Sequence, residues 1–228
     1  MDTDQPRPIV AIDGPAGAGK STVARLLARD LGYTYLDTGA MYRAVALMAL
    51  RAGVSWDDPE RLSALAESLQ IHFLPGVERP RVLVGEADVS QEIRTPEIDQ
   101  GASRVSQWPG VRTAMVEQQR RMARGGGVVL DGRDIGSVVF PDARVKIFLT
   151  ASVEERARRR TEDLAARGIA ADLERVREEV LQRDRRDTER EHAPLRRADD
   201  AVEVVTDGLT IPEVVARLAA LVRERAAE

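Results

Sequence analysis

Residues 14–21 have the types and spacing of a loop that binds phosphate groups. They read Gly-Pro-Ala-Gly-Ala-Gly-Lys-Ser, which matches the pattern G-x-x-x-x-G-K-[ST] after a predicted strand and at the start of a predicted helix. Glycines let the backbone wrap closely enough for several N–H groups to point at phosphate oxygens, and the helix N-terminus adds positive potential. We expect Lys20 to reach the β- and γ-phosphates of a nucleotide and the Ser21 hydroxyl to ligate Mg²⁺.

The alternative to this prediction is a glycine-rich turn that precedes a helix by chance. Only Lys20 and Lys146 are lysines among the 34 basic residues, so a chance match that includes a lysine is rare. We therefore predict a nucleotide-binding loop, whose residues are Gly14, Pro15, Ala16, Gly17, Ala18, Gly19, Lys20, Ser21 and Thr22.

Asp131 ends an apolar run, residues 128–131, in the position of an acid that orients Mg²⁺ through water. Aspartates at strand ends are common, so a role in a simple turn is the alternative. A GTPase of the usual kind reads guanine with an Asn-Lys-x-Asp segment, whereas this chain contains no asparagine. The sequence therefore favours another class of nucleotide-binding protein.

Arginines and acids cluster at two further places. Arg133 and Asp134 follow the apolar run, and Arg183, Asp187 and Arg190 are spaced i, i+4, i+7. This spacing predicts that the last three project from one helical face. A solvated, salt-bridged helix surface is the alternative for them, and it is the prediction for most of residues 153–191.

The abundance of arginine fits one reaction well. Phosphoryl transfer between two phosphates brings two anions together, so cations are needed on both sides, and the attacking oxygen is already ionised, so no general base is required. The planar guanidinium binds phosphate oxygens bidentately and keeps its charge. His72 and His192 lie far apart in the sequence and are expected to be ordinary surface or structural residues.

The order of predicted elements indicates an α/β fold. Short apolar runs predict strands at 8–13, 33–37, 128–131, 145–149 and 201–205. Helical spacing predicts helices at 20–31, 38–51 (with Thr38 as N-cap), 62–69, 96–107, 111–124, 153–191 (interrupted at Gly168) and 211–225. This alternation implies right-handed crossovers and a parallel sheet covered on both faces.

Residues 56–95 differ in sequence pattern from the rest of the chain. After one helix they contain short predicted strands at 71–74, 81–84 and 87–89 with Gly/Pro turns between them, which indicates an insertion into the α/β core.

Composition limits the remaining classes of function. The net charge of -4 argues against broad electrostatic binding to nucleic acid. The chain has no cysteine, which excludes disulfides and thiolate chemistry and suits a reducing compartment. No apolar run is long enough to span a bilayer, and the polar first eight residues carry no signal core. We expect a cytoplasmic protein with no nucleic-acid or membrane partner.

Four segments, in this order, resemble the bacterial cytidylate kinases. They are residues 14–22, residues 36–43 (Leu-Asp-Thr-Gly-Ala-Met-Tyr-Arg), residues 131–136 with 139–143, and residues 183–190 followed by 193–195. The similarity runs from about residue 9 to residue 218 and is far more specific than any one motif.

The resemblance implies a fold and an activity. The fold is the three-layer P-loop fold with a parallel sheet of about five strands: a core of residues 1–55 and 109–228, an enlarged NMP-binding insertion at 56–108, and a short lid at about 160–172. The activity is transfer of the γ-phosphoryl group of ATP, with Mg²⁺, to CMP or dCMP. Lid candidates for the ATP phosphates are Arg156, Arg158, Arg159 and Arg160.

The resemblance also implies the residues of the site. Lys20, Arg133, Arg183 and Arg190 would be catalytic, and Ser21 and Asp131 would serve the metal ion, Asp131 through water. Thr38 (often serine in the family), Arg112, Asp134 and Arg190 would lie by the base, Ser103, Arg183 and Asp187 by the ribose, and Arg43, Arg133 and Arg190 by the acceptor phosphate.

Two other functions remain open at this stage. One is a P-loop kinase for another small acceptor, such as UMP or a sugar acid. The other is a nucleotide sensor without catalysis, for which an intact Lys20–Ser21 pair and a full acceptor-side arginine set would be superfluous. For the leading function we expect a monomer that binds ATP and CMP or dCMP.

Overall fold

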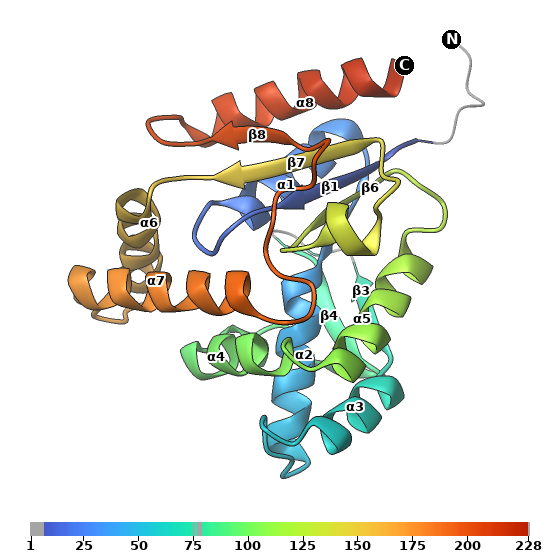
Figure 1. Ribbon diagram of the computed structural model, residues 1–228, viewed down its shortest axis with the longest axis vertical. Coiled ribbons are helices and arrows are strands. Elements are labelled where there is room, and N and C mark those ends of the chain that lie inside the picture. Colours follow the sequence, from blue (N-terminus) through green and yellow to red (C-terminus); the bar gives the residue numbers. More distant parts are fainter. Residues whose placement is uncertain (1–6, 75, 77–78, 228) are drawn as a thin grey trace. The chain divides into compact units, whose positions relative to one another are not determined.

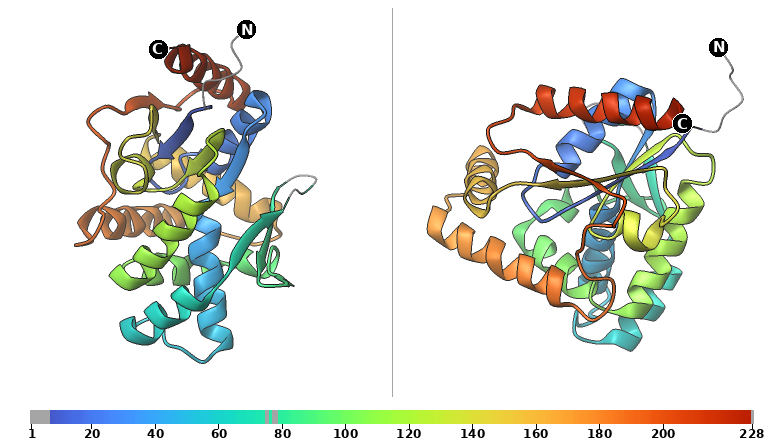
Figure 2. Two further views of the ribbon diagram at one scale, coloured as in Figure 1. Left: turned by 90° about the vertical axis from the view of Figure 1, so that its right-hand side faces the viewer. Right: turned by 45° about the horizontal axis from the view of Figure 1, so that its top comes forward.

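The structure is a computed structural model that describes residues 7–74, 76 and 79–227. The first six residues of the predicted core, residue 228, and residues 75, 77 and 78 of a predicted turn lie outside the described residues. The chain divides into two compact units: unit 1 contains residues 1–34 and 126–228, and unit 2 contains residues 35–125. Figures 1 and 2 show the elements of both units.

Five strands of the described chain form a sheet in the order β2-β6-β1-β7-β8. Their bounds are β1 (Ile9–Asp13), β2 (Thr34–Asp37), β6 (Val128–Asp131), β7 (Val145–Thr150) and β8 (Val202–Val205). The central strand β1 is apolar and mostly buried, and it pairs in parallel with both β6 and β7. The register sets Ile12 opposite Asp131, so the loop after β1 begins beside the carboxyl end of β6.

The helices of unit 1 are α1 (Lys20–Leu31), α6 (Val153–Ala166), α7 (Leu173–Glu189) and α8 (Ile211–Ala227), with a π-helical segment η2 (Ile135–Val139). Helix α1 packs against α8, and α6 packs against α7 (Figure 2). The buried residues of α1, among them Val23, Ala24 and Leu27, are spaced for one helical face.

Unit 2 contains five helices or helical turns and three strands within its described residues. They are α2 (Thr38–Arg51), α3 (Pro59–Ser68), β3 (Ile71–Leu74), β4 (Arg81–Val84), β5 (Ala87–Asp88), η1 (Glu92–Arg94), α4 (Pro96–Val105) and α5 (Pro109–Met122). The strands form an antiparallel sheet in the order β3-β4-β5. Helix α2, whose faces are largely buried, packs against α3, α4 and α5 around one apolar cluster.

The predicted fold class, α/β with a parallel five-stranded sheet, is confirmed. The predicted insertion, residues 56–108, lies inside unit 2, which also takes in α2 and α5. Its assignment as the NMP-binding part, and that of residues 160–172 as a lid, stay predictions. Within the part of the chain that the structure describes, no helix has the length and apolar character needed to cross a membrane.

One local prediction was wrong, and two helix boundaries differ from those predicted. The N-cap of α2 is Asp37, whose carboxylate accepts from the Ala40 N–H at 2.8 Å, and Thr38 is the first helical residue. The helix predicted at 111–124 begins two residues earlier, at Pro109, whose fixed φ and missing N–H are tolerated at the start of a helix. The helical stretch predicted to reach residue 191 ends at Glu189, and Arg190 is the C-cap residue of α7.

Candidate functional site

The loop between β1 and α1 leaves backbone N–H groups for an anion. Gly14, Gly17 and Gly19 have φ values of 146°, 79° and 86°, which L side chains rarely adopt. Gly19 is the N-cap of α1 and supplies no side-chain cap, and the first turn of this fully described helix contains no acidic residue. The N-terminal N–H groups and the positive end of the helix dipole are therefore not neutralised by a capping or acidic side chain of the helix itself.

Two side chains that follow the loop are held beside it. The Lys20 ammonium donates to the Pro15 carbonyl oxygen at 2.7 Å, so the lysine folds back over its own loop. The Ser21 hydroxyl donates to Asp131 Oδ2 at 2.8 Å. A hydroxyl and a carboxylate at this separation are oxygen ligands of the kind that Mg²⁺ prefers, so this pair fits the predicted metal site.

Burial is the main influence on the charge of Lys20. The ammonium is buried, and this burial, together with the guanidinium groups of Arg133 and Arg183, lowers the pKa of Lys20 well below its usual value, while Asp131 and Asp187 act in the opposite direction. An anionic ligand at this place would relieve the repulsion and favour the charged form. The arrangement is therefore suited to hold phosphate groups.

Arg133 and Asp187 form a buried ion pair in unit 1. Arg133 Nε lies 2.8 Å from Asp187 Oδ2, and its Nη1 donates to the Gly132 carbonyl at 3.2 Å. Burial lowers the pKa of Arg133, but the carboxylates of Asp187, Asp131 and Asp184 together outweigh it and the net shift is upward. Burial likewise raises the pKa of Asp187, and Arg133 and Arg183 outweigh it, so the net shift is downward. Both groups are therefore kept ionised.

Arg190 reaches the same cluster from beyond the helix. Its Nη2 lies 3.7 Å from Asp134 Oδ1, and its Nε donates to the Ala193 carbonyl at 2.6 Å. The chain turns back after α7, where the Leu195 N–H donates to the Asp187 carbonyl at 2.7 Å. Unit 1 thus brings together the predicted site residues Lys20, Ser21, Asp131, Arg133, Asp134, Arg183, Asp187 and Arg190.

Unit 2 holds the other predicted residues. Arg43, on α2, pairs with the N-cap Asp37 at 2.8 Å and lies 4.0 Å from Asp99. Thr38 opens the same helix and is buried. The acids fix the guanidinium of Arg43 at the N-terminal end of α2.

Ser103 and Arg112 are buried on α4 and α5 of unit 2. Arg112 Nη1 donates to the Ser106 carbonyl at 3.3 Å, and its guanidinium lies 5.8 Å from the centre of the Tyr42 ring. The buried Ser103 hydroxyl finds no hydrogen-bond partner among the described residues. A buried polar atom in this state costs free energy unless a ligand or water binds it.

Asp13 is a buried residue of unit 1 whose role the sequence reasoning missed. Its two carboxylate oxygens accept from the backbone N–H groups of Ile135 and Gly136 at 2.8 and 2.7 Å. These bonds hold the start of η2, directly after Arg133 and Asp134. The only local signal is an acid at the end of β1, because the partners lie more than a hundred residues away.

The titration of Asp13 gives a testable pH dependence. Burial, opposed by the two N–H groups, raises its pKa from 3.8 to about 6, with Asp134 adding to the rise and Lys20 opposing it. The folded state therefore binds the proton more readily than the unfolded state, so Asp13 favours folding at low pH and loses this contribution as pH rises through 6. Relative to Asp13→Asn, we expect wild type to gain about 1 kcal/mol of unfolding free energy between pH 7.5 and 5. Urea denaturation of both proteins measures it, and a difference that is the same at both pH values would contradict the assignment.

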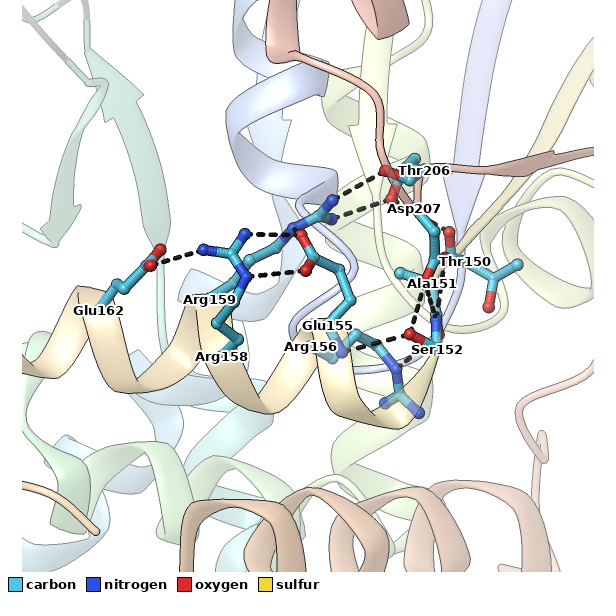
Figure 3. A network of polar contacts seen from close by, with 10 residues as sticks. All are labelled: Thr150, Ala151, Ser152, Glu155, Arg156, Arg158, Arg159, Glu162, Thr206 and Asp207. Atoms are coloured by element: carbon cyan, nitrogen blue, oxygen red, sulfur yellow. Dashed lines mark hydrogen bonds and ion pairs between the residues drawn. The ribbon is translucent and has the colours of Figure 1, made fainter. Parts of the chain in front are cut away.

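Several arginines of α6 form hydrogen bonds and ion pairs with nearby protein groups (Figure 3). Arg159 donates to Glu155 and to both oxygens of Thr206, and Arg158 pairs with Glu155 and Glu162. Arg156 is only 4% exposed and bonds the carbonyl oxygens of Ala151 and Ala16. Of the lid candidates, Arg156 is therefore packed against the phosphate-binding loop.

The chain is similar to known proteins over nearly its whole length. The family model described as cytidylate kinase matches residues 10–224. The chain is 56% identical over 220 residues to the cytidylate kinase of Geobacter sp. (strain M21), covering 96% of this chain and 94% of that protein. It is 53% identical over 216 residues to the cytidylate kinase of Geobacillus thermodenitrificans (strain NG80-2), covering 95% and 96%.

Among solved structures, the chain resembles an uncharacterised protein from Eubacterium ventriosum. The TM-score is 0.52 and the identity 10%, over 95% of this chain and 99% of that one. This likeness concerns the fold alone. The family model and the two relatives extend over nearly the whole chain, and on their strength the chain belongs to the cytidylate kinase family.

Proposed function

We propose that the chain transfers the γ-phosphoryl group of ATP to CMP or dCMP, giving CDP or dCDP and ADP. Membership of the cytidylate kinase family supports this reaction. The observation that supports the chemistry is an arrangement of charged groups in unit 1. The phosphate-binding loop, with Lys20 and the Ser21–Asp131 pair, lies beside Arg133, Arg183 and Asp187. That arrangement suits a reaction between two anions.

The donor side of the reaction follows from the loop. Its N–H groups and the N-terminus of α1 bind the β- and γ-phosphates, and Lys20 exchanges the Pro15 carbonyl for phosphate oxygens. Ser21 and Asp131 would hold Mg²⁺, Asp131 through water, and the ion would supply further neutralisation of the phosphate oxygens. The attacking oxygen of the acceptor phosphate is ionised already, so the chain needs no group to remove a proton.

The acceptor side of the proposal uses the residues that the family resemblance implies. Arg43, Arg133 and Arg190 bind the acceptor phosphate, and Ser103, Arg183 and Asp187 bind the ribose. Thr38, Arg112, Asp134 and Arg190 bind the base. The buried, unsatisfied hydroxyl of Ser103 supports its role, because a ribose hydroxyl would satisfy it.

Residues 56–108 and 160–172 complete the proposal as the NMP-binding insertion and the lid. Closure of such segments excludes water, which would otherwise accept the phosphoryl group and waste ATP. We expect the active form to be a monomer in the cytoplasm.

A panel of acceptors tests the proposed function. With ATP and Mg²⁺ held constant, ADP release is measured with CMP, dCMP, UMP, AMP and a sugar acid. We expect kcat/KM for CMP or dCMP to exceed that for each other acceptor by at least about tenfold, since a site that hydrogen-bonds its substrate rejects analogues that leave buried polar groups unpaired. A preference for UMP, AMP or the sugar acid would instead favour a kinase for that acceptor.

A further inference from the structure

Arg156 joins three segments of unit 1 through one guanidinium group. Its Nε donates to the Ala151 carbonyl at 3.0 Å, and its Nη1 donates to the Ala16 carbonyl, in the phosphate-binding loop, at 3.1 Å. Its Nη2 lies 2.7 Å from Asp184 Oδ2, on α7. Figure 3 shows this side chain at the start of α6, turned toward Ala151.

The bond to Ala16 orients a peptide group of the phosphate-binding loop. In a trans peptide the C=O and N–H groups point in opposite directions, so a donor that holds the Ala16 carbonyl turns the Gly17 N–H away from α6. Gly17 itself packs on the backbone of Arg156, since a Cβ at Gly17 would lie 3.2 Å from the Arg156 carbonyl oxygen. The loop therefore meets α6 through both a backbone contact and a charged hydrogen bond.

Asp184 holds the guanidinium from the opposite direction. It directly follows Arg183 and lies one helical turn before Asp187, so the same stretch of α7 carries both the predicted ribose contacts and the partner of Arg156. Its second oxygen, Oδ1, is buried without a hydrogen-bond partner in the described chain. Arg156 is therefore the ion-pair partner of this carboxylate at 2.7 Å, and separating the two would leave a partly buried charge without its nearest counter-charge.

We propose that Arg156 is a positioning residue for the donor phosphates: anchored by Asp184 of α7, it fixes the Ala16–Gly17 peptide so that the Gly17 N–H is aimed at ATP. The inference deepens the proposed function and rests on it for the identity of the donor. It also sets Arg156 apart from a lid arginine that swings onto the nucleotide, because its guanidinium is buried and is held by Ala151, Ala16 and Asp184.

Conservative variants test this role. Arg156→Lys keeps the charge but replaces the planar guanidinium by a single ammonium nitrogen, which cannot reach all three partners from one position. Asp184→Asn removes the charge that anchors Arg156. We expect each to weaken binding of a non-hydrolysable ATP analogue with Mg²⁺, by about tenfold for Arg156→Lys, as measured by calorimetry. In Arg156→Lys, affinity for CMP should stay within about twofold of wild type, because the contacts described for Arg156 are to Ala151, Ala16 and Asp184 and none is to an acceptor residue.

A double mutant shows whether the two residues act together. If Arg156 depends on Asp184, Arg156→Lys with Asp184→Asn should bind the analogue no more weakly than Arg156→Lys alone, apart from about a factor of two. The matched control is Arg177→Lys: Arg177 also joins α7 to α6, lying 3.7 Å from Glu154, but its pairing is more exposed and does not involve the loop. This control should bind the analogue as wild type does.

Three results would overturn the proposal: a loss of analogue affinity below about threefold in Arg156→Lys, an equal loss in Arg177→Lys, or effects of the two substitutions that multiply. If Arg156→Lys does not fold, Asp184→Asn alone decides by the same threefold limit. Binding of the analogue does not require transfer to CMP. A chain inactive on CMP would therefore refute the proposed function and leave this test standing.

Discussion

Replacing Lys20 by alanine is expected to lower kcat by about 10²-fold or more, because the ammonium strengthens its hold on the phosphate oxygens as charge shifts in the transition state. The fold should remain intact. Burial, and then the guanidinium groups of Arg133 and Arg183, lower the pKa of Lys20. The charge of Lys20 therefore adds little to the free energy of unfolding of the protein without nucleotide. Steady-state kinetics with CMP, and thermal unfolding without nucleotide, measure the two effects.

Lys146 offers a matched control for this substitution, since it is the other lysine of the chain. Its ammonium bonds the Pro141 carbonyl and lies 2.7 Å from Asp200, in a structural pairing. Lys146→Gln should therefore lower the temperature of unfolding and leave kcat within about threefold of wild type. Near-normal turnover by Lys20→Ala would defeat the assignment of Lys20 to catalysis.

Truncation of Arg183 is expected to weaken CMP binding by about 10- to 100-fold, the worth of a charge-assisted hydrogen bond to a ligand. ATP binding should change by less than about threefold, because the phosphate-binding loop keeps its own contacts. Asp187→Asn should act in the same direction, since it also weakens the ion pair in which Asp187 lies 2.8 Å from Arg133. Calorimetric titrations with CMP and with a non-hydrolysable ATP analogue separate the two affinities.

Arg186→Ala is the control on the same helix. Arg186 is exposed and donates to the Gln182 carbonyl at 3.4 Å, so its loss should leave both affinities unchanged. A variant of Arg183 or Asp187 that weakens the ATP analogue more than CMP would place these side chains on the donor side instead.

Strong local patterns made much of the fold predictable from the sequence. The strand Val128–Asp131 was predicted with its observed bounds, because a β-branched apolar run ends there in an acid. The loop of residues 14–21 was recognised because its glycines are needed for a special backbone. Both features depend on residues adjacent in the sequence, which is where pattern reasoning is strongest.

Features that depend on distant partners were not predictable in the same way. The helix predicted to reach residue 191 ends at Glu189, and the Leu195 N–H of the returning chain donates to the Asp187 carbonyl. The anchoring of η2 by Asp13 and the hold of Arg156 on Ala16 join residues more than a hundred positions apart. No local spacing reports such contacts. The extent of unit 2, residues 35–125, likewise follows from the packing of α2 and α5.

Backbone amides of the phosphate-binding loop, the Lys20 ammonium and several guanidinium groups are proposed to cancel the repulsion between ATP and a pyrimidine monophosphate. The most direct test incubates the purified protein with ATP, Mg²⁺ and CMP and follows CDP by chromatography, with binding of each nucleotide measured in parallel. We predict CDP and ADP in equal amounts. A protein that binds both nucleotides and yet forms no CDP would contradict this account.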